Sequence, residues 1–262
     1  MNIIKNNFET PKDLINFIIM NLHEELNKKK NDENLFDNNI MPNQSDREAM
    51  LNYFLQNFMK ECNSFISDNF YGTILNQFEC LNCKSKKYNY NIYSYLIFPL
   101  EDVVKFKENK LMLNNINSIT IDDCFEFNQR IQTLSGEDAI TCTECKLIYP
   151  SNNNTFIFTA PEILIIIFEK SKEMDIKLEV NLELNLYDHI IKRETGFKYN
   201  LIGIVSKYKK FGMNEYFIAC CKSPINNCWY KYNNDIVCKI NNIKNDIFES
   251  GEPNILFYQK DN

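Results

Sequence analysis

The sequence predicts an α+β fold, and three observations support this class. Helix-like periodicity is confined to the first quarter of the chain, and short strand-like runs follow from Phe70 to the end. This order of helices first and strands afterwards is typical of α+β folds. Two CxxC pairs in the strand-rich part indicate a β-rich subdomain built around a metal. With 262 residues, 44% of them hydrophobic, the chain can bury one sizeable core.

Two helices are expected near the N-terminus. Residues 11–27 have Pro11 in a first turn and Thr10 as a candidate N-cap. Residues 28–46 are polar and rich in Asn, which indicates a loop or mobile insertion. Residues 47–68 return to a helical pattern. Apolar residues spaced three or four apart give the expected buried positions of the two helices: Leu14, Ile15, Ile18, Ile19, Leu22 and Leu26, then Met50, Tyr53, Phe54, Phe58, Cys62 and Phe65.

Strands are expected where β-branched and aromatic runs alternate with turn residues. The run from Ile163 to Phe168 is apolar throughout, so it predicts a central strand buried on both faces. Segments 105–118 and 150–154 are expected to be loops. The strand-like runs are 88–99, 155–169, 176–186, 199–208, 215–221, 228–232 and 253–258.

The composition argues against two classes of partner. A net charge of −6 does not suit a general nucleic-acid binder, which needs an excess of Lys and Arg. It suits a partner with a basic face, although a small negative charge also serves solubility alone. The N-terminus turns polar before any apolar stretch of useful length, and the longest apolar run is too short to span a bilayer. We therefore expect no membrane partner and an intracellular location, in the cytoplasm or the nucleus.

The strongest chemical signal is the pair of motifs Cys80-Leu-Asn-Cys83 and Cys142-Thr-Glu-Cys145. A two-residue spacing lets a tight turn direct both sulfurs at one point, and two such turns complete the tetrahedral thiolate shell that Zn²⁺ prefers. The long separation of the pairs fits two hairpin ends of an extended finger. Four protein ligands leave no open position, so the predicted role of Zn²⁺ is structural. Four unrelated free thiols are the alternative.

The other six cysteines are expected to be small buried hydrophobic residues. None of them has a histidine or a glycine-rich turn nearby in the sequence, which argues against a nucleophile. They are Cys62, Cys124, Cys220, Cys221, Cys228 and Cys238.

Seven ordered segments together carry a family resemblance. The two CxxC pairs are among them, the first preceded by Phe70-Tyr-Gly72 and followed by Ser85. The others are Leu22–Asn27 (LHEELN), Pro161–Phe168, Tyr199–Val205, Trp229–Val237 and Ile255–Tyr258. From about residue 9 to residue 258 the chain therefore resembles the ubiquitin-specific protease family of cysteine-type deubiquitinases.

The resemblance implies one domain over 1–262, with a papain-like palm and thumb and β-rich zinc-binding fingers. The thumb helices would lie in 9–68, the fingers with the zinc site in 70–150 and the palm sheet in 155–258. It also implies ubiquitin or a ubiquitinated protein as the partner and the hydrolysis of ubiquitin conjugates as the family activity.

The catalytic positions depart from the family pattern. The family's N-x-G-N-T-C-Y box lies upstream of the LHEEL helix, and the chain begins too late to contain it. The segment Met213-Asn-Glu-Tyr216 stands where the family has G-H-Y, so Glu215 occupies the histidine position. Asn233 takes the third position of the triad, which the family allows, and Asn234 adjoins it. The only histidines, His23 and His189, are expected to be surface or packing residues.

Glutamate is a poor substitute for the imidazole. From reference pKa values, proton transfer from a thiol to imidazole is uphill by about 3 kcal/mol, and transfer to a carboxylate by about 6 kcal/mol. A carboxylate also repels the thiolate that an imidazolium would stabilise. The expectation is a catalytically inactive module. The alternatives are a fragment of an active deubiquitinase whose cysteine segment lies upstream, and a zinc-stabilised interaction scaffold.

Overall fold

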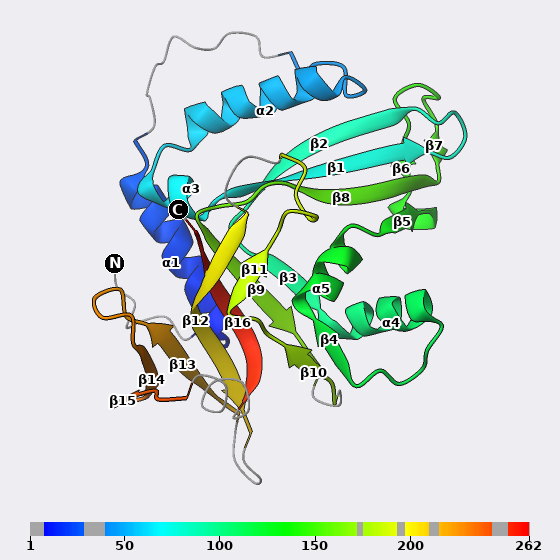
Figure 1. Ribbon diagram of the computed structural model, residues 1–262. Coiled ribbons are helices and arrows are strands. Elements are labelled where there is room, and N and C mark those ends of the chain that lie inside the picture. The colour runs from blue at the N-terminus through cyan, green and yellow to red at the C-terminus, as the bar shows by residue number, and fades with distance from the viewer. Residues whose placement is uncertain are drawn as a thin grey trace.

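The computed structural model describes residues 8–28, 40–171, 175–192, 197–209, 215–242 and 251–261. Helices at the N-terminal side, a long finger-like sheet and a larger palm sheet form three parts of one α+β body (Figure 1). The predicted fold class is confirmed. No helix in these ranges is long and apolar enough to cross a membrane.

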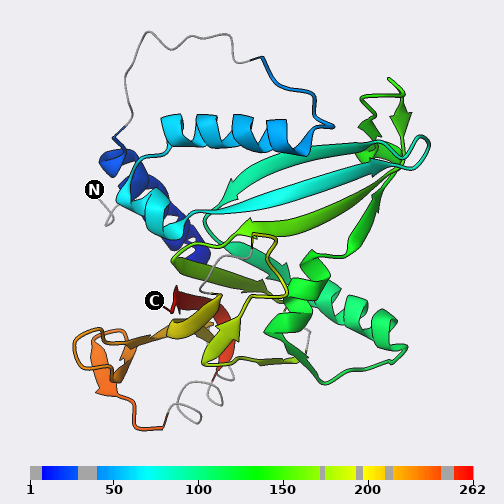
Figure 2. The ribbon, with the colours of Figure 1, turned by 45° about the horizontal axis from the view of Figure 1, so that its top comes forward.

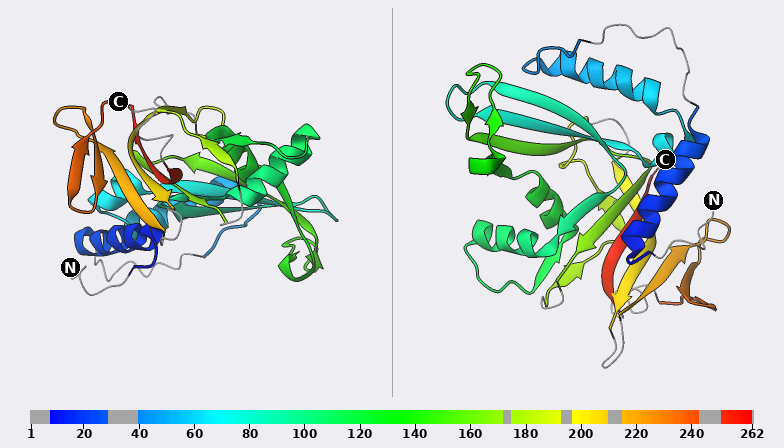
Figure 3. Two further views of the ribbon diagram at one scale, coloured as in Figure 1. Left: turned by 90° about the horizontal axis from the view of Figure 1, so that it is seen from below. Right: turned by 180° about the vertical axis from the view of Figure 1, so that it is seen from behind.

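The thumb contains three helices: α1 (Pro11–Leu26), α2 (Arg47–Glu61) and α3 (Phe65–Phe70). Thr10 caps α1 as predicted, because its side chain accepts from the Asp13 backbone N–H while the Asp13 carboxylate accepts from the Thr10 N–H. Ile19 of α1 is buried against the palm sheet, and α1 crosses one face of that sheet (Figure 3, right).

The predicted helix over 47–68 is in fact two helices. Ser64 forms a capping box with Ser67, so a separate helix, α3, begins at Phe65, where the apolar pattern of the sequence predicts one continuous helix. As a result Phe65, an expected core residue, lies at the first turn of α3 and is 65% exposed. Residues 29–39 of the Asn-rich insertion lie outside the described residues.

The fingers are a four-stranded sheet in the order β2–β1–β8–β5. α2 lies along this sheet and buries Met50 against Leu75 and Tyr90 (Figure 2). At the far end, the short 3₁₀ helix Gly136–Asp138 leads into a small hairpin of β6 and β7. The strands are β1 (Gly72–Cys80), β2 (Lys86–Tyr93), β5 (Ile131–Leu134), β6 (Ile140–Thr141), β7 (Ile148–Tyr149) and β8 (Ser151–Thr159).

The palm is an eight-stranded sheet in the order β15–β14–β13–β12–β16–β9–β3, with β11 added beside β12. All neighbours are antiparallel except β3 and β9. The strands are β3 (Leu96–Pro99), β9 (Ile163–Glu169), β11 (Glu183–Asn185), β12 (Lys198–Tyr208), β13 (Tyr216–Lys222), β14 (Trp229–Asn233), β15 (Ile236–Lys239) and β16 (Glu252–Lys260).

β9 is the central buried strand that the apolar run predicts. Ile165 and Ile167 pack towards α1 and α3, whereas Leu164, Ile166 and Phe168 pack into the larger core on the opposite face. Successive side chains of a strand point to opposite faces, so a continuous apolar run is the mark of a strand covered on both sides.

The second face of the palm is covered by α4 (Leu100–Leu111) and α5 (Ile121–Asn128). Between these helices in the chain lies β4 (Ser118–Thr120), which pairs in parallel with β10 (Lys177–Glu179). The expectation of a loop over 105–118 is wrong for its first part, which is the C-terminal half of α4. Residues 151–154, expected in a loop, belong to β8.

Pairing differs from the expected division of the chain at 150–155. β3 belongs to the palm although it lies within 70–150, and the end of β8 belongs to the fingers although it lies within 155–258. The chain therefore passes from the fingers to the palm at β3, returns to the fingers at β5 and enters the palm again at β9. Only the strand pairing reveals this path.

Candidate functional site

Two turns with the same geometry bring the CxxC motifs together at the end of the fingers. In the first, the Cys80 N–H donates to Ser85 O and the Lys84 N–H donates to Cys80 O. In the second, the Cys142 N–H donates to Leu147 O and the Lys146 N–H donates to Cys142 O. Lys84 and Lys146 also share a left-handed backbone, with φ values of 61° and 60°. The two turns are thus equivalent knuckles from distant parts of the sequence.

The four predicted cysteines form one cluster, since all four Sγ atoms lie within 4.8 Å of one another. Cys83 Sγ and Cys142 Sγ are 3.6 Å apart. Four sulfurs bound about 2.3 Å from one tetrahedral Zn²⁺ would be roughly 3.8 Å from one another. The donor set and its spacing therefore fit a four-thiolate metal site.

Hydrogen bonds to the sulfurs divide the thiols into two kinds. The Cys145 N–H and the Ser85 hydroxyl stabilise the thiolate of Cys142 and lower its pKa to about 6. The Ser85 side chain also lowers the pKa of Cys83. At Cys145 the Asn82 amide favours the thiolate, but contacts with the other thiols and desolvation outweigh it and raise the pKa to about 12. A cation among the four sulfurs would favour the thiolate form of all of them.

Glu215 lies immediately before β13 and forms an ion pair with Lys207 of β12, with Nζ and Oε2 2.8 Å apart. Beside this pair, Tyr208 and Tyr216 stack with their ring centroids 5.5 Å apart. Lys207 was not identified from the sequence. The sequence carries no local signal for it, because only the antiparallel pairing of Tyr208 with Tyr216 brings Lys207 and Glu215 to the closing end of one hairpin.

Asn233 is the last residue of β14, and Asn234 opens a two-residue turn with a φ of 51°. Ala219 pairs with Tyr232, so the next step of the register sets Asn233 against Ile218, three positions along β13 from Glu215. The two predicted catalytic positions thus lie towards the same end of two neighbouring strands. Met213 and Asn214 of the predicted motif lie outside the described residues.

Both histidines have packing surroundings. His23 Nδ1 lies 2.7 Å from Ser64 Oγ, and its ring lies against Tyr71. His189 is buried, stacks on Phe125 and places Nε2 3.3 Å from Asp122 Oδ1. The contacts of His23 are with Ser64 and Tyr71, and those of His189 are with Phe125 and Asp122.

The remaining cysteines only partly follow the prediction of buried hydrophobic residues. Cys124 and Cys220 are buried, and burial raises the pKa of the Cys124 thiol far above its usual range. Cys62 and Cys228 are half-buried. Cys221 and Cys238 are exposed, so the prediction is wrong for these two. Both lie on strands near the edge of the palm, Cys221 in β13 and Cys238 in β15.

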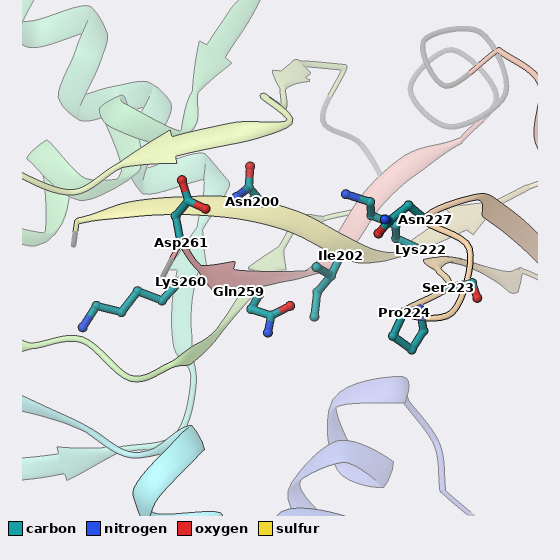
Figure 4. Close-up of a pocket in the computed structure, with 9 residues that line it drawn as sticks. All are labelled: Asn200, Ile202, Lys222, Ser223, Pro224, Asn227, Gln259, Lys260 and Asp261. Carbon is teal, nitrogen blue, oxygen red and sulfur yellow. The ribbon is translucent and has the colours of Figure 1, made fainter.

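A cavity of about 440 Å³ opens at the other end of the palm from Glu215. Its lining comes from β12, from the loop after β13 and from the end of β16 (Figure 4). Asn200, Ile202 and Lys222 are among the residues that line it. None of the predicted catalytic or metal-binding residues lines this cavity.

A hand-shaped α+β body with a four-cysteine cluster at the end of its fingers defines the class of the protein. The ubiquitin carboxyl-terminal hydrolase family matches residues 8–258, and the chain belongs to this family.

The curated relatives are distant and longer. Drosophila melanogaster ubiquitin carboxyl-terminal hydrolase Usp2 is 23% identical over 263 residues, which cover 97% of this chain and 26% of that protein. Human ubiquitin carboxyl-terminal hydrolase 43 is 23% identical over 178 residues, covering 56% of this chain and 16% of that protein. The chain thus spans about a quarter or less of the length of these two relatives.

Solved structures share the fold. The yeast SAGA DUBm with an Sgf73 mutant matches with a TM-score of 0.65 at 18% identity, over 96% of this chain and 50% of that one. The SAGA Ubp8/Sgf11/Sus1/Sgf73 DUB module bound to ubiquitin aldehyde matches with a TM-score of 0.58 at 17% identity, over 82% of this chain and 47% of that one.

Proposed function

We propose that this chain is a ubiquitin-binding deubiquitinase-family module that does not cleave ubiquitin conjugates. The observation that carries the proposal is the ion pair between Glu215 and Lys207, at the position where the family resemblance places the catalytic histidine. A carboxylate held by an ammonium neither stabilises a thiolate nor takes up its proton as an imidazole does. Asn233 would then be the remnant of the triad rather than its working third member.

The recognition of ubiquitin is supported by fold rather than by chemistry. The related Ubp8 modules were solved bound to ubiquitin aldehyde and to monoubiquitin. The net charge of −6 suits a partner with a basic surface. The proposal places the module in a reducing intracellular compartment, because its cysteines are free thiols.

The four-cysteine cluster is proposed to hold structural Zn²⁺ through Cys80, Cys83, Cys142 and Cys145. The ion would neutralise the thiolates and join the two knuckles, which no disulfide joins. A closed thiolate shell offers no site for substrate, so the ion would take no part in hydrolysis.

Two measurements separate the possibilities. Labelled monoubiquitin is titrated against the chain, and the chain is incubated with a ubiquitin probe that carries a cysteine-reactive C-terminus. We expect saturable binding and no covalent adduct, with an active deubiquitinase as the positive control. A covalent adduct lost on addition of a thiol-blocking reagent would contradict the proposed inactivity, and absent or millimolar binding would favour the scaffold alternative.

The coverage of the relatives favours a second candidate, a fragment of an active deubiquitinase. The chain matches relatives that are much longer, so a cysteine-bearing segment could be encoded elsewhere in the gene product. Sequencing the full transcript tests this candidate directly. An N-x-G-x-x-C box upstream would support it, and its reconstitution with Glu215→His should then raise hydrolysis above that of the Glu215 form.

A further inference from the structure

β15 is the outermost strand of the palm, and one of its edges faces no other strand. It is the last strand of the sheet and pairs with β14 on one side, and the described part of the chain supplies no partner for its other side (Figure 1). Seen from below, strands β13 to β15 lie at one extremity of the molecule (Figure 3, left). Natural sheets blunt such edges with prolines, bulges or charges, because a bare edge is a template for another strand.

The edge of β15 lacks most of these protections. Its four residues, Ile236-Val-Cys-Lys239, are all exposed, with Ile236 at 63% and Val237 at 55%. The strand has no proline, and its pairing with β14 is unbroken by a bulge. β-Branched residues at its centre favour further pairing. A lysine occurs only at its C-terminal end.

The hairpin register determines which backbone groups face outwards. Asn233 and Ile236 flank a two-residue connection, so they form the hydrogen-bonded pair that closes the hairpin. Ile240 N–H donates to Trp229 O at 2.8 Å, so the even-numbered residues face β14. Val237 and Lys239 therefore direct their N–H and C=O groups to the open edge.

This edge is complementary to itself. An antiparallel partner centred on Val237 would set Val237 against Val237 of the second copy, with both backbone N–H groups donating across the axis. The same axis brings Asp235, in the turn that precedes β15, towards Lys239 of the second copy, once on each side of the axis. Ile236 then lies against Cys238. Opposite charges flank an apolar centre, which is the pattern that stabilises cross-strand pairs.

We propose that two copies of this chain associate through β15, joining their palm sheets into one continuous antiparallel sheet about a two-fold axis. A strand of this length gives a small interface, so the dimer is reversible and forms in the micromolar to millimolar range. Neither the cysteine cluster nor Glu215 lies on this strand.

Reversing the charge of Asp235 or of Lys239 tests whether the dimer forms through β15 and in this register. Asp235→Lys gives two Lys–Lys contacts and Lys239→Asp gives two Asp–Asp contacts, so each variant alone should dimerise at least about tenfold more weakly than the parent chain. An equimolar mixture of the two restores both opposite-charge contacts and should recover the dimer. Sedimentation equilibrium over a dilution series measures each constant. The matched control pair is Glu25→Lys and Lys60→Asp, on exposed positions of α1 and α2, and it should dimerise like the parent.

A cross-link gives an independent reading of the register. Ile236→Cys places a thiol opposite Cys238 of the second copy in a non-hydrogen-bonded pair, a position suited to a disulfide. Mild oxidation should give a covalent dimer that disappears in the Ile236→Cys, Cys238→Ser double variant. A parent chain that stays monomeric throughout, or single charge variants that dimerise as well as the parent, would overturn the proposal, whereas recovery in the mixture would establish it.

Discussion

Lys207 Nζ lies 2.8 Å from Glu215 Oε2, and this pair closes the β12–β13 hairpin at one end of the palm sheet. Lys207 also stands opposite Glu252 in the neighbouring strand, and Glu252 binds Lys170 at 2.9 Å. Alternating charges thus run from Glu215 through Lys207 and Glu252 to Lys170. A position that the family resemblance assigns to an acid–base residue is here part of a charged ladder that holds strands together.

The Lys207–Glu215 pair should contribute measurably to stability because it is three-quarters buried, with 24% and 27% of the two side chains exposed. We expect Lys207→Met or Glu215→Gln alone to lower the free energy of unfolding by about 1–2 kcal/mol, since each removes one partner of a largely buried ion pair. A double-mutant cycle from urea denaturation should give a coupling of about 1 kcal/mol. The exposed Lys105–Asp102 pair, 3.9 Å apart, is the control and should give a coupling near zero. Equal coupling in both cycles would contradict the structural role.

Removing metal should affect the fingers and leave the palm in place. Cys142→Ser takes away the central thiol of the cluster, so metal content measured by elemental analysis should fall from one ion per chain to a small fraction. The second knuckle, around 136–150, should then become sensitive to protease. Trp229 is the only tryptophan and is buried in the palm, so its emission should not change.

Cys221→Ser is the matched control for this experiment, because Cys221 is exposed and lies outside the cluster. It should keep the metal and the protease resistance of the parent. A full complement of metal in Cys142→Ser would show that the cluster is not the binding site.

Much of the fold was predictable because local signals and burial agree. The capping residues Thr10 and Pro11 fixed the start of α1, and the apolar run of β9 fixed the centre of the palm. The helix α5 was missed although Thr120 and Asp123 form a capping box at its start. Its eight residues are too few for a clear helical period, and tertiary packing rather than propensity stabilises it.

One part of the candidate site was also predictable from the sequence, and another part was not. The cysteine cluster was predictable because each CxxC pair is a local device that needs only a tight turn. The partner of Glu215 was not predictable, because Lys207 reaches it through the register of two strands. Likewise, the exposure of Cys221 and Cys238 depends on which strands end the sheet, and composition carries no information about sheet order.

Acid should weaken the α4–α5 region through Asp123. Burial by itself would raise the pKa of this carboxyl, but hydrogen bonds from Lys107 Nζ at 2.7 Å and from Thr120 outweigh it and hold the pKa below its ordinary value. A carboxyl with a lowered pKa stabilises the fold above its unfolded pKa of about 3.9 and loses that contribution as the pH falls through the folded value.

Asp123→Asn should therefore cost about 1–2 kcal/mol of unfolding free energy at neutral pH. The difference between variant and parent should shrink as the pH falls from about 4 through the lowered pKa of the folded state, because the parent carboxyl then becomes protonated as well. Urea denaturation at several pH values measures this, with the exposed Asp138→Asn as control. A difference that stays constant down to strongly acidic pH would show that the charge of Asp123 is not what matters.

Gly72 should tolerate no side chain, because the ring of Tyr93 occupies the space where a Cβ would lie. Tyr93 cannot easily move: it is buried, and its hydroxyl donates to Thr159 O at 3.2 Å across the finger sheet. Gly72→Ala should therefore lower the free energy of unfolding by about 1–3 kcal/mol, the usual cost of overpacking. Tyr93→Leu removes the contacting ring tip and has a cost of its own, so the informative quantity is the coupling between the two changes. If the clash is the cause, Gly72→Ala will cost much less in the Tyr93→Leu background than in the parent, as urea denaturation of the four proteins will measure. An equal cost in both backgrounds would mean that the backbone of β1, and not the ring of Tyr93, requires glycine at this position.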